Sequence, residues 1–90
     1  MPVDLEEMKK YLRVDFNDDD VLIENFITTG QTLCADIARL TVDEFSKKPT
    51  ARIAVMYAVA YLYERRENAD YKELVLSLRA MLFGIRKEGF

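Results

Sequence analysis

The sequence contains no histidine and only one cysteine, Cys34. Histidine is the commonest general base and the commonest metal ligand, so its absence removes the usual basis for acid–base or metal chemistry. One cysteine cannot form an internal disulfide, and the fold therefore does not depend on an oxidising compartment. We predict that the protein is not an enzyme and that it has no catalytic, cofactor-binding or metal-binding residues.

Glycine and proline are also scarce, with three and two residues in a chain of 90. Apolar residues recur at helical spacing, strand-like alternation is rare, and no repeat or linker divides the chain. A chain of this length makes one domain, so residues 1–90 are expected to form a single unit. We predict an all-α fold, a compact bundle of four to five short helices.

Start and stop signals outline the expected helices. Asp4 with Glu7, and Thr41 with Glu44, have capping-box spacing, in which each side chain bonds to the other residue's backbone N–H. Gly84 is the expected stop of the last helix. The expected helices cover residues 4–12, 18 or 19 to 40, 41–47, 49–68, and 70 or 71 to 83.

The second and longest segment has a broad apolar stripe. Gly30 lies in its middle, where glycine costs roughly 1 kcal/mol relative to alanine, and this indicates a close helix crossing. Cys34 lies within the stripe and has no histidine to activate it, so a packed core thiol is expected. The predicted inward residues are Leu22, Phe26, Leu33, Ile37 and Leu40, with Ile23, Ile27 and Cys34 widening the stripe.

An uninterrupted apolar run extends from Ile53 to Tyr63. As a helix it would rise about 16 Å, whereas a bilayer core is about 30 Å thick, so a membrane span is not expected. Because the run is apolar all round, we predict that it is the central helix of the bundle, buried on most sides. Tyr57, Tyr61 and Tyr63 carry hydroxyls that need partners, so one or more should reach an edge or an interface.

Residues 15–20, DFNDDD, suggest the start of a calcium-binding loop. An EF-hand loop begun at Asp15 requires glycine at its sixth place and glutamate at its twelfth, but the chain has Asp20 and Phe26 there. A solvated acidic cluster at the start of a helix explains the segment better, because carboxylates are favoured by the helix dipole at that end.

Four charged residues follow the apolar run directly. The helix dipole favours cations near a helix C-terminus, which is a structural explanation for both arginines. Arg66 also lies three residues after Tyr63, on the same helix face, and tyrosine and arginine are enriched at interface hot spots. The candidate interface at this point comprises Tyr63, Arg65, Arg66 and Glu67.

Three segments together resemble a known family. LEEMKKYLRVD at residues 5–15 is followed by an acidic run into a long helix. AYLYERRE at 60–67 is similar to an L-Y-E-N-R-E signature, with Arg65 replacing the asparagine, and LRAMLFGIR at 78–86 is similar to R-x-L-L-x-x-x-R. In this order and spacing they resemble the small head–tail connector (adaptor) proteins of tailed bacteriophages and prophages, often described as DNA-packaging proteins.

The resemblance implies a helical, non-enzymatic subunit. Many copies would form a ring beneath the portal protein, extend the DNA channel and dock tail-completion or stopper proteins. The resemblance places the protein in the virion, at the phage neck, after assembly in the bacterial host cytoplasm, with no membrane association. It also implies a C-terminal segment that reaches neighbouring subunits, which adds Arg86 and Phe90 to the candidate interface.

The net charge of the chain helps to distinguish a connector from a protein that binds nucleic acid. The net charge of −3 argues against nucleic-acid binding as the main task and suits a channel wall to which passing DNA should not adhere. A second class, a small helical regulator that binds DNA or a host protein, stays open. A helix-turn-helix reader would need a basic recognition helix, whereas the expected helix 18–40 begins with acidic residues. Tight, salt-dependent binding of duplex DNA in a gel shift would favour the regulator.

Overall fold

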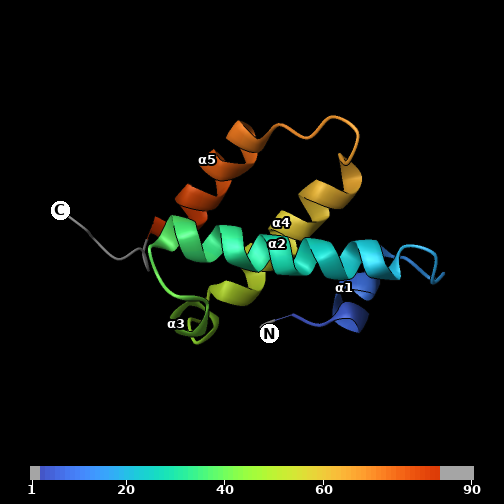
Figure 1. Ribbon diagram of the computed structural model, residues 1–90, viewed down its shortest axis with the longest axis horizontal. Coiled ribbons are helices and arrows are strands. Elements are labelled where there is room, and N and C mark those ends of the chain that lie inside the picture. The colour runs from blue at the N-terminus through green and yellow to red at the C-terminus, as the bar shows by residue number, and fades with distance from the viewer. Residues whose placement is uncertain (1–2, 84–90) are drawn as a thin grey trace.

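The computed structural model describes residues 3–83, and within that range the chain is helical without strands (Figure 1). The all-α prediction is confirmed. Gly84, Arg86 and Phe90, which the sequence singled out, lie outside the described residues. The helices are α1 (Leu5–Leu12), α2 (Asp20–Ala38), α3 (Val42–Ser46), α4 (Ala51–Glu64) and α5 (Tyr71–Leu82).

Helices α2 and α4 form the centre of the bundle. Figure 1 shows α2 crossing the whole molecule, with α1 and α3 below it, while α4 passes behind it and rises to the upper right, from where a loop returns to α5 at the upper left. Both α2 and α4 contact each of the other three helices. None of the helices in residues 3–83 combines the length and apolar character needed to cross a bilayer.

The two capping boxes form as predicted. The backbone N–H of Glu7 donates to the Asp4 carboxylate at 2.8 Å, and that of Glu44 donates to the Thr41 hydroxyl at 3.1 Å. In both boxes the glutamate side chain accepts from the backbone N–H of the capping residue. These bonds satisfy donors that would otherwise lack partners at a helix start, so α1 and α3 begin where the sequence indicates.

Several helix ends differ from the expectation. The helix expected to reach residue 40 ends at Ala38, because Arg39 adopts a left-handed conformation with φ of 58°. The helix expected at 49–68 is shorter at both ends and spans Ala51–Glu64. Its backbone leaves the helical conformation at Arg65, where φ is −122° and ψ is 32°. Arg39 occupies a left-handed position where glycine is the usual residue, and Arg65 ends α4 without a glycine. The residue types at these two stops therefore do not indicate where the helices end.

The buried face of α2 is displaced from the predicted stripe. Its fully buried apolar positions follow the line of Ile23, Ile27 and Cys34, which the sequence treated as the margin. The reason is the close approach of α4: a Cβ added to Gly30 would lie 3.3 Å from the Cβ of Ala58. The predicted close crossing at Gly30 is therefore confirmed. The residues expected at the centre of the stripe are partly buried at its flanks: Leu22, Phe26, Leu33, Ile37 and Leu40.

Helix α4 is central but not surrounded. Ile53 is 62% exposed and Tyr57 is 37% exposed, although both belong to the apolar run that was expected to be buried on most sides. The expectation that one of the tyrosines reaches an edge is confirmed at Tyr57. Cys34 is fully buried among apolar residues, and this burial raises the pKa of its thiol to about 12. It is the packed core thiol that the sequence predicts.

Candidate interaction site at the end of helix α4

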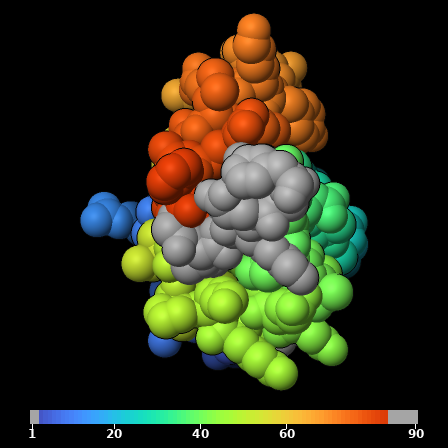
Figure 2. Space-filling model, turned by 90° about the vertical axis from the view of Figure 1, so that its left-hand side faces the viewer, coloured from blue at the N-terminus to red at the C-terminus, as the bar shows by residue number. Residues whose placement is uncertain are grey.

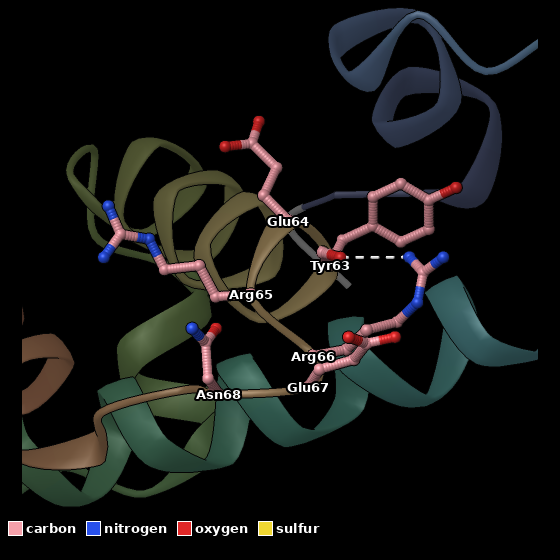
Figure 3. A pocket seen from close by; sticks show the side chains of 6 residues that line it. All are labelled: Tyr63, Glu64, Arg65, Arg66, Glu67 and Asn68. Atoms are coloured by element: carbon pink, nitrogen blue, oxygen red, sulfur yellow. Dashed lines mark hydrogen bonds between the residues drawn. The ribbon is translucent and has the colours of Figure 1, made fainter.

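Four of the candidate interface residues of the sequence, Tyr63, Arg65, Arg66 and Glu67, lie where α4 ends. The chain turns at residues 65–68 and then continues into α5, leaving an open hollow of about 520 Å³ beside the turn. In Figure 3 the side chains of Arg65 and Arg66 extend to opposite sides of the helix end. The hollow is lined by Tyr63, Glu64, Arg65, Arg66, Glu67 and Asn68.

Tyr61 and Arg65 fix the connection from α4 to α5. The Tyr61 hydroxyl accepts from the backbone N–H of Asp70 and donates to its carbonyl, both at 3.0 Å. Asp70 in turn caps α5 by accepting from the Glu73 N–H at 3.2 Å. The Arg65 guanidinium lies 5.0 Å from the centre of the Tyr61 ring and donates to the Glu73 carboxylate at 3.3 Å. Tyr61 therefore fixes the loop before α5 through its hydroxyl and orients Arg65 through its ring.

Tyr63 and Arg66 repeat this arrangement on the other side. The Tyr63 hydroxyl donates to the carboxylate of Asp19 at 2.6 Å, which ties the end of α4 to the start of α2. The Arg66 guanidinium lies 4.7 Å from the centre of the Tyr63 ring and donates to the Tyr63 carbonyl at 3.0 Å (Figure 3). The sequence predicted that Tyr63 and Arg66 share a helix face, and in the structure the Arg66 guanidinium lies over the Tyr63 ring.

The acidic end of α2 determines the electrostatics around Tyr63. The pKa of Tyr63 is raised above its usual 10.0, chiefly because its hydroxyl donates to the Asp19 carboxylate and further because of burial and the negative charge of Asp19. The nearby Arg66 guanidinium lowers the pKa of Tyr63, but by less than these effects raise it. Next to Asp19, the carboxylate of Asp20 pairs with the Lys9 ammonium at 2.8 Å. The charged cluster thus joins α1, α2 and α4 at one place.

Sequence reasoning missed several members of this site. Tyr61 was assigned to the apolar run with a hydroxyl in need of a partner, but no partner was identified, and Asp19 was assigned only to a solvated acidic cluster. The spacing of Tyr61 and Arg65, four residues apart in a helix, is the signal that would have indicated their contact. The contacts of Asp19 with Tyr63 and of Arg65 with Glu73 have no local signal, because each depends on how the helices pack.

The arrangement is suited to binding acidic groups. Each guanidinium is planar and has five N–H donors, so a partner's carboxylates can be bound in bidentate fashion after one donor is used internally. Within residues 3–83 no group of three or more histidine, cysteine or acidic side chains is placed to hold a metal ion. The fold and this helix end together define a small all-α domain with an open, charged and aromatic surface.

Comparison with known families identifies the protein more narrowly. The family described as phage gp6-like head-tail connector protein matches residues 2–88, so the chain belongs to this family. This confirms the resemblance found in the sequence. No curated protein and no solved structure matches the chain. Membership gives a structural connector role, a place in the virion and association with phage portal and tail proteins in general.

Proposed function

We propose that the protein forms a ring under the portal of a tailed phage or prophage, extends the DNA channel and docks tail-completion or stopper proteins. Its membership of the head-tail connector family supports this proposal. The observation that carries the docking role is the pair of arginine–tyrosine stacks at the end of α4, at 5.0 Å and 4.7 Å. The candidate interface comprises Tyr63, Arg65, Arg66 and Glu67, together with Arg86 and Phe90 beyond the described residues.

Preorganisation makes these arginines good contact residues. A free arginine side chain loses conformational entropy when a partner immobilises it, and this loss weakens binding. Arg65 and Arg66 are exposed, yet each is already held against a tyrosine ring and by one hydrogen bond. A partner carboxylate therefore meets guanidinium groups that are already oriented, and less entropy is lost on docking.

The charge of the chain supports passage of DNA without specific binding. The net charge is −3, and acidic residues dominate the start of α2. A wall of this sign repels phosphates. In a gel shift at physiological salt, we expect no retention of duplex DNA. Tight, salt-dependent retention would contradict the channel role and favour a DNA-binding regulator.

The docking role is tested by Arg66→Ala. Circular-dichroism melting should be unchanged, because Arg66 is exposed, while affinity for the cognate portal should fall about tenfold, or about 1.4 kcal/mol. Arg52→Ala is the matched control, since Arg52 is an exposed arginine near the other end of α4 that pairs with Glu7. Equal losses in both variants, or none in Arg66→Ala, would contradict the proposal.

Electron microscopy of the protein mixed with its portal tests the ring itself. We expect a closed ring of subunits coaxial with the portal. Isolated subunits that bind neither portal nor tail proteins would remove the basis of the proposed function.

A further inference from the structure

An outward stripe of α4 is covered only in part by the rest of residues 3–83. Ile53, Tyr57, Ala60 and Glu64 follow one another at helical spacing, on the side opposite the buried face of α4. We call these four residues the α4 stripe. Ile53 and Tyr57 are exposed, and Tyr11 of α1 flanks the stripe. An open hollow of about 390 Å³ lies along it, lined by Tyr11, Tyr57, Ala60, Tyr61, Glu64 and Arg65.

A second outward stripe lies on α5. Lys72, Leu76 and Arg79 of α5, with its C-cap residue Phe83, have the same spacing and lie on the side away from the buried residues of that helix. We call these the α5 stripe. Leu76 is 57% exposed and Phe83 is 77% exposed. Figure 2 shows α5, in orange and red, standing at the surface on this side of the molecule. Exposed apolar residues grouped in this way mark interaction sites more often than single ones do.

The two stripes complement each other in one orientation only. We propose that the α4 stripe of one subunit packs antiparallel on the α5 stripe of a second copy of this chain, a contact that rests on the proposed ring-forming function. The antiparallel order pairs Ile53 with Phe83, Tyr57 with Arg79, Ala60 with Leu76, and Glu64 with Lys72.

Each of these pairs is chemically matched. Ile53 and Phe83 cover each other's apolar surface. Arg79 lies against the Tyr57 ring, where a guanidinium is attracted by the face of the aromatic ring. The small side chain of Ala60 leaves room in the hollow for Leu76.

Charge selects the antiparallel direction. Glu64 meets Lys72 when the two stripes run in opposite directions, and the opposite charges attract. In the parallel order Lys72 would cover Ile53 and Phe83 would cover Glu64. A charge would then lie against an apolar side chain at each end, which is unfavourable because burial removes its water without supplying a partner.

A contact between two different surfaces is head-to-tail. Repeated around an axis, such a contact closes into a ring, whereas a contact between identical surfaces stops at a dimer. Four residues on each side make an interface well below the size of a stable isolated complex. Subunits therefore associate weakly in solution through this contact. The stripes do not include the candidate docking residues at the end of α4, although Glu64 also lines the hollow there.

Disulfide trapping tests the contact directly. In a Cys34→Ala background, purified Ile53→Cys and Phe83→Cys chains are mixed at high concentration and oxidised. We expect at least fivefold more covalent dimer in the mixture than from either variant alone, because the proposed pairing holds the two thiols close together, whereas identical exposed thiols meet only by random collision. A chain that carries both substitutions should give a ladder of dimers, trimers and larger species.

Two controls make the result specific. Ile53→Cys mixed with Lys72→Cys reports the parallel order and should give at least fivefold less dimer. Adding Glu64→Lys to the Ile53→Cys chain should lower the yield severalfold, and Lys72→Glu in the Phe83→Cys chain should restore it. Circular dichroism verifies that each variant is folded.

The outcomes separate this contact from the proposed function. A dimer yield in the mixture no higher than from either variant alone, a higher yield in the parallel pairing, or a product that stops at a dimer in the doubly substituted chain would overturn the contact. If electron microscopy still shows a ring on the portal, the connector function stands and another surface joins the subunits. A ladder without any portal binding would keep the contact and overturn the proposed function.

Discussion

Within the apolar run of residues 53–63, the inner and outer faces of α4 are both apolar but lie in different environments. The inner face carries alanine and valine at Ala54, Val55, Ala58 and Val59, all fully buried, whereas Ile53 on the outer face is 62% exposed. Within this run, the inner face has small side chains at the crossing with α2, so side-chain size distinguishes the two faces there. Small side chains allow α2 to approach closely, so that face becomes the inner one.

The first prediction enlarges the inner face. Ala58→Leu should lower the free energy of unfolding by about 3 kcal/mol, because overpacking forces side chains and backbone apart. Ala58 is fully buried opposite Gly30, where even a single Cβ would be 3.3 Å away. Urea unfolding measures the change. Ala60→Leu on the outer face is the matched control, and we expect a change within about 0.5 kcal/mol.

A change in the free energy of unfolding below about 0.5 kcal/mol for Ala58→Leu would contradict the proposed difference between the two faces of α4. It would mean that α2 and α4 can move apart without cost, and that size does not select the inner face.

The second prediction extends the comparison to α2. A fully buried leucine replaced by alanine costs about 2–5 kcal/mol. Leu33 was expected to lie inward, but it is partly buried at the flank of the α2–α4 contact. We therefore expect Leu33→Ala to cost about 2 kcal/mol, at the low end of that range. A denaturant melt measures it beside Ile27→Ala, whose side chain is fully buried and whose cost should be clearly larger. Equal costs would contradict the assignment of Leu33 to the flank.

Much of the fold is predictable from the sequence because its signals are local. The capping residues Asp4 and Thr41 act within one turn of the helix, so their pattern is sufficient. Gly30 costs helix stability, so its presence within a helix indicated a packing reason. Cys34 was expected in the core because it lies in an apolar stripe without an activating residue.

The remaining features depend on contacts between distant residues. The stop of α2 at Arg39 uses a left-handed conformation that arginine adopts only at a cost, so the residue type gave no sign of it. The end of α4 at Glu64 accompanies the bonds between Tyr61 and Asp70. The hydrogen bond from Tyr63 to Asp19 joins residues 44 positions apart. Such pairs are defined only once the helices are packed, and helical periodicity does not show them.

The third prediction concerns the polar end of α4. Tyr63→Phe removes the hydroxyl that donates to Asp19 and keeps the ring on which Arg66 lies. We expect a loss of about 1 kcal/mol of stability at neutral pH, the usual contribution of a hydrogen bond. Chemical unfolding measures the loss, and portal affinity should stay within about threefold because the stack remains. A portal defect as large as that of Arg66→Ala would assign the hydroxyl itself to docking.

The pH dependence of this bond has a definite sign. The raised pKa of Tyr63 means that the folded state favours the protonated hydroxyl. Its contribution to stability is therefore complete below the ordinary pKa of 10.0 and is lost as pH rises through the raised pKa. Burial raises the pKa of the Cys34 thiol to about 12, so the protein also loses stability as this thiol ionises at high pH. Cys34 is present in both proteins, and its effect therefore cancels in their difference. The difference between the parent protein and Tyr63→Phe should thus shrink above about pH 10, and a constant difference would contradict the bond to Asp19.

The smallest effect on folding is expected at the outer face. Ile53→Ser removes a large apolar side chain, yet the side chain is 62% exposed, so the free energy of unfolding should change by no more than about 0.5 kcal/mol. The same change removes the apolar end of the α4 stripe, and sedimentation at high protein concentration should therefore show weaker self-association. Ile53 would then serve contacts between chains, while Ala58, on the opposite face of the same helix, serves the fold. A loss of stability above about 1 kcal/mol would show instead that Ile53 contributes to the core, and the distinction between the two faces of α4 would fail at its most exposed large apolar residue.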